Sequence, residues 1–568
     1  MRARTSLEVG TMLLLASTAF GAVIKVPGDQ PSITAAVAAA TSGDTIKIAA
    51  GRWQEAVTTI TSLTFKGEAG TIWDGYFSSS DHDQLTVTAD SVKVQGIEFQ
   101  NGFSCLIITG DDAKVTGCRF RGCAEAVYVD GARANVSNNT FTGMVNPNGF
   151  AVEIDGADCV ANENVIKNSW GFGIDLDAES LGSATCDENN VHNNQEFGQI
   201  SVRNAAAPSV QRNVFSNCYS SAECINVSNC DDAKVIGNTV LNVNYNVAYG
   251  IYVEGANAVV SRNVVENLNH YNGEIYGIGV IGDDCDVLKN MVYGINSGES
   301  FWSWGIHVSG NDANVQKNQV YDCGGGGGYS YGIYIDGADL VCRKNRVVRM
   351  NNEYTYGLYL DGADADVGGN RVMYVMESAA IHVTGADFHV YGNYCSHMAY
   401  DCYGIETSGS GTGPGLAIME DNTVVNGVYL GIDHSGDGVI LRRNDCTLIG
   451  DAAFNISGTN NTIDRCAARD VAGDGFYVSG AGNTLSRCKA TDCDKDGFDI
   501  GAGAGNSLNL CKATNCAAEG LDNGGTGTTA TNCTLKRSRI DFAGGGGMTS
   551  WAGTTYTTGG EGVSGEID

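Results

Sequence analysis

Short segments in which apolar and polar residues alternate follow one another along most of the chain. Val, Ile and Tyr dominate them, and Gly-Ala pairs and single Asn residues separate them, as in YGIYVEGANAVVSRNVV at 249–265 and YGIYIDGADLVCRKNRVV at 331–348. Alternation with a period of two predicts β-strands. No stretch within these units is long and amphipathic enough to predict a helix, so the pattern indicates an all-β chain.

One Asn position marks the repeat, and its steps are mostly 22–28 residues. An all-β unit of this length matches one turn of a parallel β-helix with three strands per turn. Adjacent turns of such a solenoid lie about 4.7–4.9 Å apart, so equivalent residues stack in columns. We therefore predict one solenoid of about 20 coils over residues 22–540. The marker positions are Asn139, Asn164, Asn189, Asn213, Asn238, Asn263, Asn290, Asn318, Asn345, Asn370, Asn393, Asn422 and Asn444, then Cys466, Cys488, Cys511 and Cys533.

These columns account for the unusual composition, 77 Gly and only 5 Pro among 568 residues. Gly supplies positive φ at one bend, and Pro is nearly excluded because it removes a donor from the strand ladder. Asn is expected to take the left-handed conformation at the other bend and to stack its amides from coil to coil. The cysteines are expected to be buried and mostly free, with Cys488/Cys493 and Cys511/Cys516 as the best candidates for disulfides.

Both ends depart from the repeat. Residues 1–21 have two Arg, a short apolar run and small residues before the expected cleavage point, which is the layout of a secretory signal peptide. Residues 22–45 predict a cap with a short Ala-rich helix after Pro31, and 541–568 a Gly/Thr-rich tail. No later apolar run approaches the roughly 18 residues of a membrane span. We expect a secreted, cell-surface or periplasmic protein.

Charge restricts the partners. With 34 basic and 65 acidic residues the net charge is −31, so the chain repels phosphate backbones and nucleic acid is not an expected partner. A polyanionic substrate would need a local basic patch or a bridging cation.

The segment VPGDQPSITAAVAAATSGDTIKIAAGRWQE at 26–55 and the G-I/L-x-V/I-x-G … N-x-V coils resemble secreted right-handed parallel β-helix proteins of the pectin-lyase-like superfamily. The resemblance covers about residues 23–540. It implies that fold and a substrate groove on the strand before the Gly turn. It does not choose among lyase, hydrolase, epimerase and non-enzymatic coat or adhesin, because one fold carries many functions.

On that strand, the positions pointing outward hold the candidate chemistry. A run over consecutive coils can supply a Tyr/His pair for proton abstraction, or two carboxylates for hydrolysis. The alternative is a polar-aromatic ladder with no function. The catalytic candidates are His307, Tyr334, Tyr359, His382, Glu406 and Asp433. The substrate-binding candidates are Trp302, Tyr329, Tyr354, Asp336 and Asp361. A further column, Tyr249, Tyr276, Trp304, Tyr331 and Tyr356, is expected to point inward.

A second patch, which is acidic, precedes the catalytic candidates in the chain. It is formed by Glu153, Asp155, Asp175 and Asp177, and Arg203 follows one coil later. Carboxylates stacked this closely repel unless they are protonated or bridged by a hard cation. Calcium is therefore the candidate ligand, and no other cofactor is expected. The resemblance to pectate-lyase-like enzymes implies calcium here too, with Arg203 as a base. A solvated acidic face is the alternative.

The leading hypothesis is an exported protein that binds and cleaves a polysaccharide or cell-surface glycan as a lyase or glycoside hydrolase. The rival is a non-catalytic surface, adhesion or carbohydrate-binding solenoid. The sequence identifies neither the sugar nor the oligomeric state.

Overall fold

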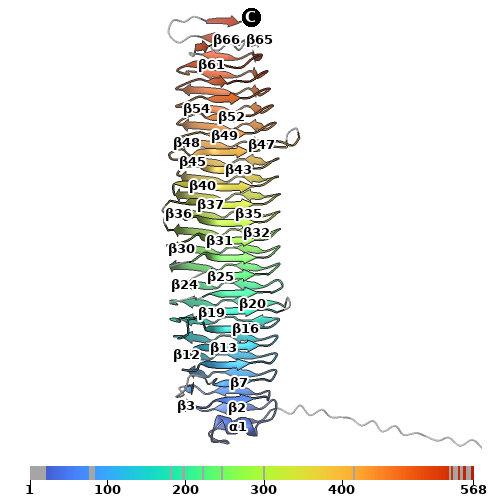
Figure 1. Cartoon of the computed structure of the whole chain (residues 1–568), viewed down its shortest axis with the longest axis vertical. Helices are drawn as coiled ribbons and strands as arrows, with labels where there is room; N and C mark the ends of the chain where they lie inside the picture. The colour runs from blue at the N-terminus through green and yellow to red at the C-terminus, as the bar shows by residue number, and fades with distance from the viewer. Residues whose placement is uncertain are drawn as a thin grey trace, which may run out of the picture.

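Each coil of the chain contributes one strand to each of three parallel sheets, called A, B and C here (Figure 1). A typical coil runs through β38 (Val341–Arg343) in sheet A, β39 (Arg346–Asn351) in sheet B and β40 (Tyr354–Asp361) in sheet C. The strands of the next coil pair with these in register. The predicted β-solenoid of about 20 turns is confirmed.

This computed structural model describes residues 21–75, 83–179, 182–194, 199–219, 223–244, 247–298, 301–325, 327–413, 416–536, 539–541, 548–550, 554–557 and 564–567. The expected signal peptide, 1–21, therefore lies outside the described residues except for its last position. The predicted domain boundaries stay predictions.

The N-terminal end is covered by the one helix of the described chain, α1 (Ile33–Ala39), between β1 (Val23–Val26) and β2 (Thr45–Ile48). Ser32 caps it by accepting a hydrogen bond from the Ala35 amide at 3.1 Å, and Ile33 is buried against the first coil. This confirms the predicted short helix. At the other end, strands continue beyond residue 540, and β67 (Ser564–Ile567) pairs antiparallel with β66 (Thr554–Thr557).

The Asn column forms the predicted ladder in the interior, just before each sheet B strand. Asn318 is fully buried; its side-chain amide donates to Val287 O at 2.8 Å and to Asn345 Oδ1 at 3.1 Å. Its own Oδ1 accepts the Asn290 amide at 2.9 Å. The expectation that Asn itself is left-handed is wrong. The residue before it takes that conformation, as Lys317 does with φ 59°, because the Asn side chain must face inward.

The Gly column lies where sheet C turns into sheet A, and it permits close approach between coils. Gly337 has φ 141°, and a Cβ there would lie 2.3 Å from Gly310 O. Positive φ and the backbone of the preceding coil together restrict this bend to glycine.

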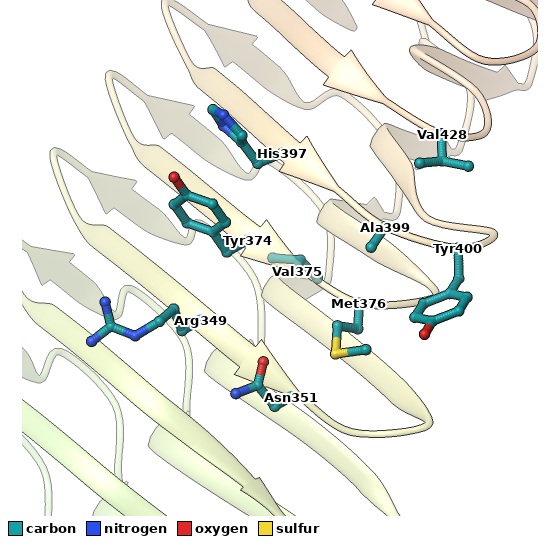
Figure 2. Close-up of a pocket in the computed structure, with 9 residues that line it drawn as sticks. All are labelled: Arg349, Asn351, Tyr374, Val375, Met376, His397, Ala399, Tyr400 and Val428. Carbon is teal, nitrogen blue, oxygen red and sulfur yellow. The ribbon is translucent and has the colours of Figure 1, made fainter.

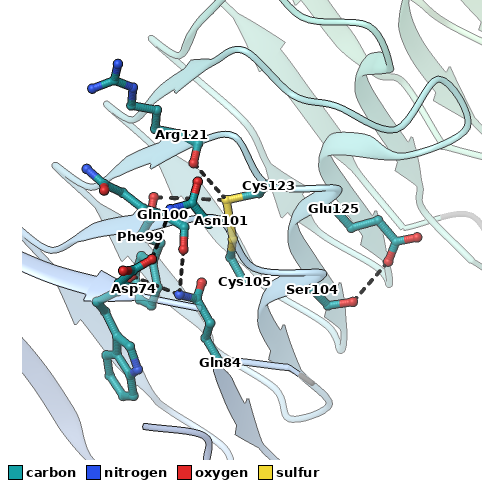
Figure 3. Close-up of a disulfide and its surroundings, with 11 residues drawn as sticks. Asp74, Gln84, Phe99, Gln100, Asn101, Ser104, Cys105, Arg121, Cys123 and Glu125 are labelled. Carbon is teal, nitrogen blue, oxygen red and sulfur yellow. Dashed lines mark hydrogen bonds between the residues drawn. A yellow bond between two sulfur atoms is a disulfide. The ribbon is translucent and has the colours of Figure 1, made fainter. Parts of the chain in front are cut away.

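The cysteines are buried, and the described chain has one disulfide, Cys105–Cys123, near the N-terminal end (Figure 3). The prediction of mostly free thiols is confirmed, but the predicted Cys488/Cys493 and Cys511/Cys516 pairs are wrong because neither pair is bridged by a disulfide. The strand β57 (Lys489–Cys493) separates the first pair by about 15 Å. Each thiol instead meets its equivalent in the next coil, Cys493 beside Cys516.

Candidate functional site

The predicted catalytic residues form one column on the outer face of sheet C. Pairing of the strands is in register from His307 to Tyr334, Tyr359, His382, Glu406 and Asp433. Alternation places these side chains outside and their neighbours in the core. The six residues lie on β34 (Ser303–Ser309), β37 (Tyr329–Asp336), β40, β43 (Ala379–Thr384), β46 (Tyr403–Ser408) and β49 (Ile432–Ser435).

Neighbours in this column touch from coil to coil. The Tyr334 and Tyr359 rings stack at 5.1 Å, and Tyr359 stacks on His382 at 4.6 Å. His382 Nδ1 lies 2.7 Å from Glu406 Oε2, and Asp433 follows Glu406 in register. Asn455 holds the other side of Asp433 through a 2.6 Å hydrogen bond. The structure thus brings a His, two carboxylates and two phenols into one continuous line.

The aromatic column expected inside the solenoid lies outside, so that prediction is wrong. Its rings do stack, with Tyr276 on Trp304 at 4.2 Å and Tyr331 on Tyr356 at 5.4 Å. However, Tyr331 also packs edge-on against Tyr334 of the outer column at 5.2 Å. The alternation slips by one residue at the Gly that follows each aromatic residue.

Gly305 shows why the alternation slips. A Cβ on Gly305 would lie 2.4 Å from a Val320 methyl group, so this position faces the core. Ile306 is also fully buried. Two consecutive inward positions push Trp304 to the outer face.

The three predicted sugar-stacking residues form a third aromatic column at the start of the same strands. Trp302 and Tyr354 are 40% and 45% exposed. Tyr329 lies between them, 5.2 Å from the Trp302 ring and 5.0 Å from the Tyr354 ring. Sheet C therefore presents three adjacent columns of rings in these coils.

The rings enclose a hollow of about 420 Å³, which we call the aromatic groove. Asp336 borders it and accepts from Ser309 at 2.8 Å, with His307 Nε2 at 3.3 Å. Burial raises the pKa of Asp336, but these two partners outweigh it and leave the pKa below its usual value. Asp361, the remaining binding candidate, lies in register one coil on, where Thr384 donates to it. The groove is lined by Trp302, Trp304, His307, Ser309, Tyr331, Tyr334, Asp336 and Tyr359.

Burial tunes the titratable groups of the column. It raises the pKa of Tyr334 and Tyr359, and neighbouring carboxylates add to the rise, so both phenols are neutral hydrogen-bond donors. Burial raises the pKa of Asp433 to about 6, and the Glu406 charge reinforces it against the Asn455 hydrogen bond. A carboxyl with a pKa near 6 next to a second carboxylate is the arrangement that separates an acid from its partner base.

Over a long stretch, the described strands of sheet C have no cationic side chain other than histidine. The described sheet C strands from β25 (Glu223–Ser228) to β61 (Glu519–Asn523) contain no Lys or Arg. They carry several Asp and Glu, including Glu254, Asp361 and Asp433. This face suits an uncharged ligand better than a polyanion.

The acidic patch lies on the same face, closer to the N-terminus. Arg203 neutralises part of it, with Nη2 2.7 Å from Asp175 Oδ2 and Nη1 3.6 Å from Asp177 Oδ2. Burial and the nearby Asp155 and Asp175 charges raise the pKa of Glu153 to about 7. Within the described ranges, no three His, Cys, Asp or Glu side chains are arranged to hold a metal ion. Calcium binding stays a prediction.

A second hollow of about 620 Å³ lies on the outside of sheet B, and the sequence reasoning missed it (Figure 2). We call it the sheet B hollow. The signal that could have found it is a Tyr followed one coil later by a His, at a position where most other coils have Asn, Asp or Gly. It is lined by Arg349, Asn351, Tyr374, Val375, Met376, His397, Ala399, Tyr400 and Val428.

Comparison with protein-family models identifies the fold as a right-handed β-helix. The family model described as a right-handed beta helix region matches residues 53–215 and 379–558. The comparison with curated proteins gives no match. No helix in the described part of the chain is both long and apolar enough to cross a membrane.

The solved structures that resemble this chain are remote from it in sequence. A PL6 family alginate lyase, AlyGC, is 10% identical over 94% of this chain and 97% of its own, with a TM-score of 0.28. A GH87 alpha-1,3-glucanase from Streptomyces thermodiastaticus strain HF3-3 is 12% identical over 91% of this chain and 64% of its own, with a TM-score of 0.17.

Proposed function

The chain belongs to the family of right-handed β-helix proteins, and on that premise we propose that it is an exported glycoside hydrolase. It binds an uncharged polysaccharide along the outer face of sheet C. The observation that carries the proposal is the continuous line of stacked rings that ends in His382, Glu406 and Asp433.

The aromatic columns supply the binding surface. Trp302, Tyr329 and Tyr354 expose flat rings along the solenoid axis, which suits the apolar faces of successive sugar rings. Tyr334 and Tyr359, neutral because their pKa values are raised, donate hydrogen bonds to hydroxyl groups of the glycan.

The two carboxyl groups supply the chemistry. Asp433, with its pKa near 6, is protonated often enough near neutral pH to donate a proton to the glycosidic oxygen. Glu406, oriented by His382, attacks the anomeric carbon, and water then releases the sugar. Adjacent coils place the two backbones about 4.8 Å apart, closer to the spacing of retaining than of inverting enzymes.

Charge favours hydrolysis over elimination. A lyase acting on a uronate must neutralise the substrate carboxylate, and the described sheet C strands in this region contain no Lys or Arg to do so. A base is also needed, and the raised pKa values of Tyr334 and Tyr359 oppose that role for the phenols.

The test is a panel of neutral and acidic polysaccharides, with release of reducing ends measured beside absorbance of unsaturated products, with and without Ca²⁺. We expect reducing ends from a neutral glycan only. Glu406→Gln and Asp433→Asn should each lose at least about a hundredfold in kcat/KM. Asp499→Asn is the matched control, because burial also raises the pKa of Asp499 to about 6 in the same outward column.

The outcomes separate the rival functions. Calcium-dependent unsaturated products from an acidic glycan would overturn hydrolysis. If a glycan binds and none is cleaved, the result would instead support a non-catalytic carbohydrate-binding solenoid.

A further inference from the structure

A kink at a fixed position in each coil of sheet B carries a column of left-handed residues. The strands concerned include β27 (Thr239–Asn244), β30 (Val264–His270), β36 (Gln319–Gly325), β39, β42 (Arg371–Val375), β45 (Tyr394–Met398) and β48 (Thr423–Gly427). In register, the column runs through Asn217, Asn242, Asn267, Gly294, Asp322, Arg349, Tyr374, His397, Asn426, Leu448, Asp470, Asp492 and Asn515, all at positive φ.

Most of this column consists of Asn, Asp and Gly, the residues that adopt the left-handed conformation most easily. Where Asn residues follow each other they form an exposed amide ladder, as Asn267 Nδ2 does with Asn242 Oδ1 at 2.9 Å. The exceptions are Arg349, Tyr374, His397 and Leu448.

The first three exceptions are consecutive, and all three line the sheet B hollow (Figure 2). Tyr374 and His397 both have φ 59°, and their rings stack at 4.7 Å. Tyr400, at the opposite wall of the hollow, has φ 52°. Tyr is a poor choice for this backbone conformation, which His tolerates better. Strained residues such as Tyr374 and Tyr400 gather at functional sites.

Packing does not explain these aromatic residues. Tyr374 is 48% exposed and Tyr400 is 58% exposed, so neither contributes a buried ring to the core. The solenoid would gain stability from Asn at Tyr374, since Asn fills this column in other coils, such as Asn267 and Asn426. A feature that costs stability and presents rings to solvent indicates a ligand.

The chemistry of the hollow defines that ligand. Its floor is apolar, with Val375 buried and Met376 half-buried between the two aromatic walls. Its polar rim is Asn351 and Arg349, and Asp322 pairs with the Arg349 guanidinium, Nη2 to Oδ2 at 2.6 Å. A neutral rim over an apolar, ring-walled floor fits a ligand with one apolar face and several hydroxyl groups.

We propose that the sheet B hollow is a second carbohydrate-binding site, which takes sugar residues of an uncharged glycan. The loops between sheets B and C separate this hollow from the aromatic groove. Asn351 lines the hollow at the end of β39, and Tyr354 of the third aromatic column follows it after one short loop. The site holds the glycan without cleaving it. It shares with the proposed function only the ligand class.

The test uses binding by calorimetry to cellohexaose, laminarihexaose and maltohexaose, with Glu406→Gln in every protein so that the probes stay intact. We expect two classes of site for at least one probe. Tyr374→Asn with His397→Asn should weaken one class at least tenfold while Tm stays equal or rises, because Asn relieves the left-handed strain. Trp302→Ala with Tyr354→Ser should weaken only the other class.

Leu510→Asn is the matched control, since Leu510 is also exposed with φ 57° but lies outside the hollow. It should raise Tm in the same way and leave binding unchanged. The proposal is wrong if the Tyr374/His397 variant binds every probe as its parent does, if that variant loses several degrees of Tm, or if no probe binds the parent. Binding at both classes without release of reducing ends by the wild-type enzyme would refute the proposed hydrolysis alone.

Discussion

His434 is a buried imidazole in an inward column where most other coils have apolar residues, such as Val383 and Ile456. It points into the core from β49, in register with Thr407 before it and Ile456 after it, and it is fully buried. Its Nδ1 lies 2.8 Å from Thr407 Oγ1, whereas Nε2 has no hydrogen-bond partner. Burial lowers the pKa of His434 to about 4, against weaker opposing effects of the Gly436 backbone and the Asp437 charge.

The sign and size of the pH effect follow from that pKa. The unfolded chain binds the proton near pH 6.5, and the folded chain only near pH 4. Above pH 6.5 the imidazole is neutral in both states and adds no pH dependence, and stability is lost as the pH falls from 6.5 to 4. The difference of about 2.5 between the two pKa values corresponds to about 3 kcal/mol of stability. Below about pH 4 both states are protonated, and no further stability is lost through His434.

The perturbation is Thr407→Val together with His434→Ile, which removes both polar partners and leaves the core apolar as in the neighbouring coils. Solenoids open locally, so the local measurement is hydrogen exchange in β46 and β49, and the global one is Tm, both between pH 7.5 and 4. On acidification the wild type should lose about 3 kcal/mol of local stability relative to the variant. Other titrating groups, including Asp433 on the opposite face, cancel in that difference.

Equal losses in the two proteins between pH 6.5 and 4 would refute the reasoning. So would a loss confined to pH values below 4, because His434 would then be fully protonated in both states. A matched control is Val383→Ile, a change in the same inward column without a titratable group.

Three further outcomes follow from the same structure. If Asp433 is the general acid, kcat/KM measured against pH should fall as the pH rises through about 6, because the carboxyl must be protonated. Asn318→Ala leaves the Asn290 amide and the Val287 carbonyl without their partner, and thermal unfolding should show a loss of about 2–5 kcal/mol. The free thiols are buried, and burial raises the pKa of Cys395 far above its usual value, so a disulfide-exchange reagent should label them only on unfolding. Rapid labelling of the native protein would contradict that burial.

Much of the candidate site could be predicted from the repeat. Once the period is known, residues at the same offset must stack, so His382, Glu406 and Asp433 fall in one column without knowledge of the coordinates. Contacts within a column are local in the solenoid, which makes them readable from the spacing.

Two predictions that depended on direction within a coil failed. The Trp304 and Tyr331 column was expected inside, but two inward positions at Gly305 and Ile306 interrupt the alternation. Cys488 and Cys493 are a candidate disulfide in the sequence, but an extended strand carries them apart.

The sequence by itself determined the repeat, the order of the coils and the membership of each column, because in-register stacking copies a fixed period into space. Only the tertiary structure decided which columns share a surface. The kink in sheet B and the slip at Gly305 set the direction of neighbouring side chains, and these depend on backbone angles and on the coil above. For that reason the aromatic groove joins three columns on sheet C, and the sheet B hollow brings Tyr374, His397 and Tyr400 around one floor.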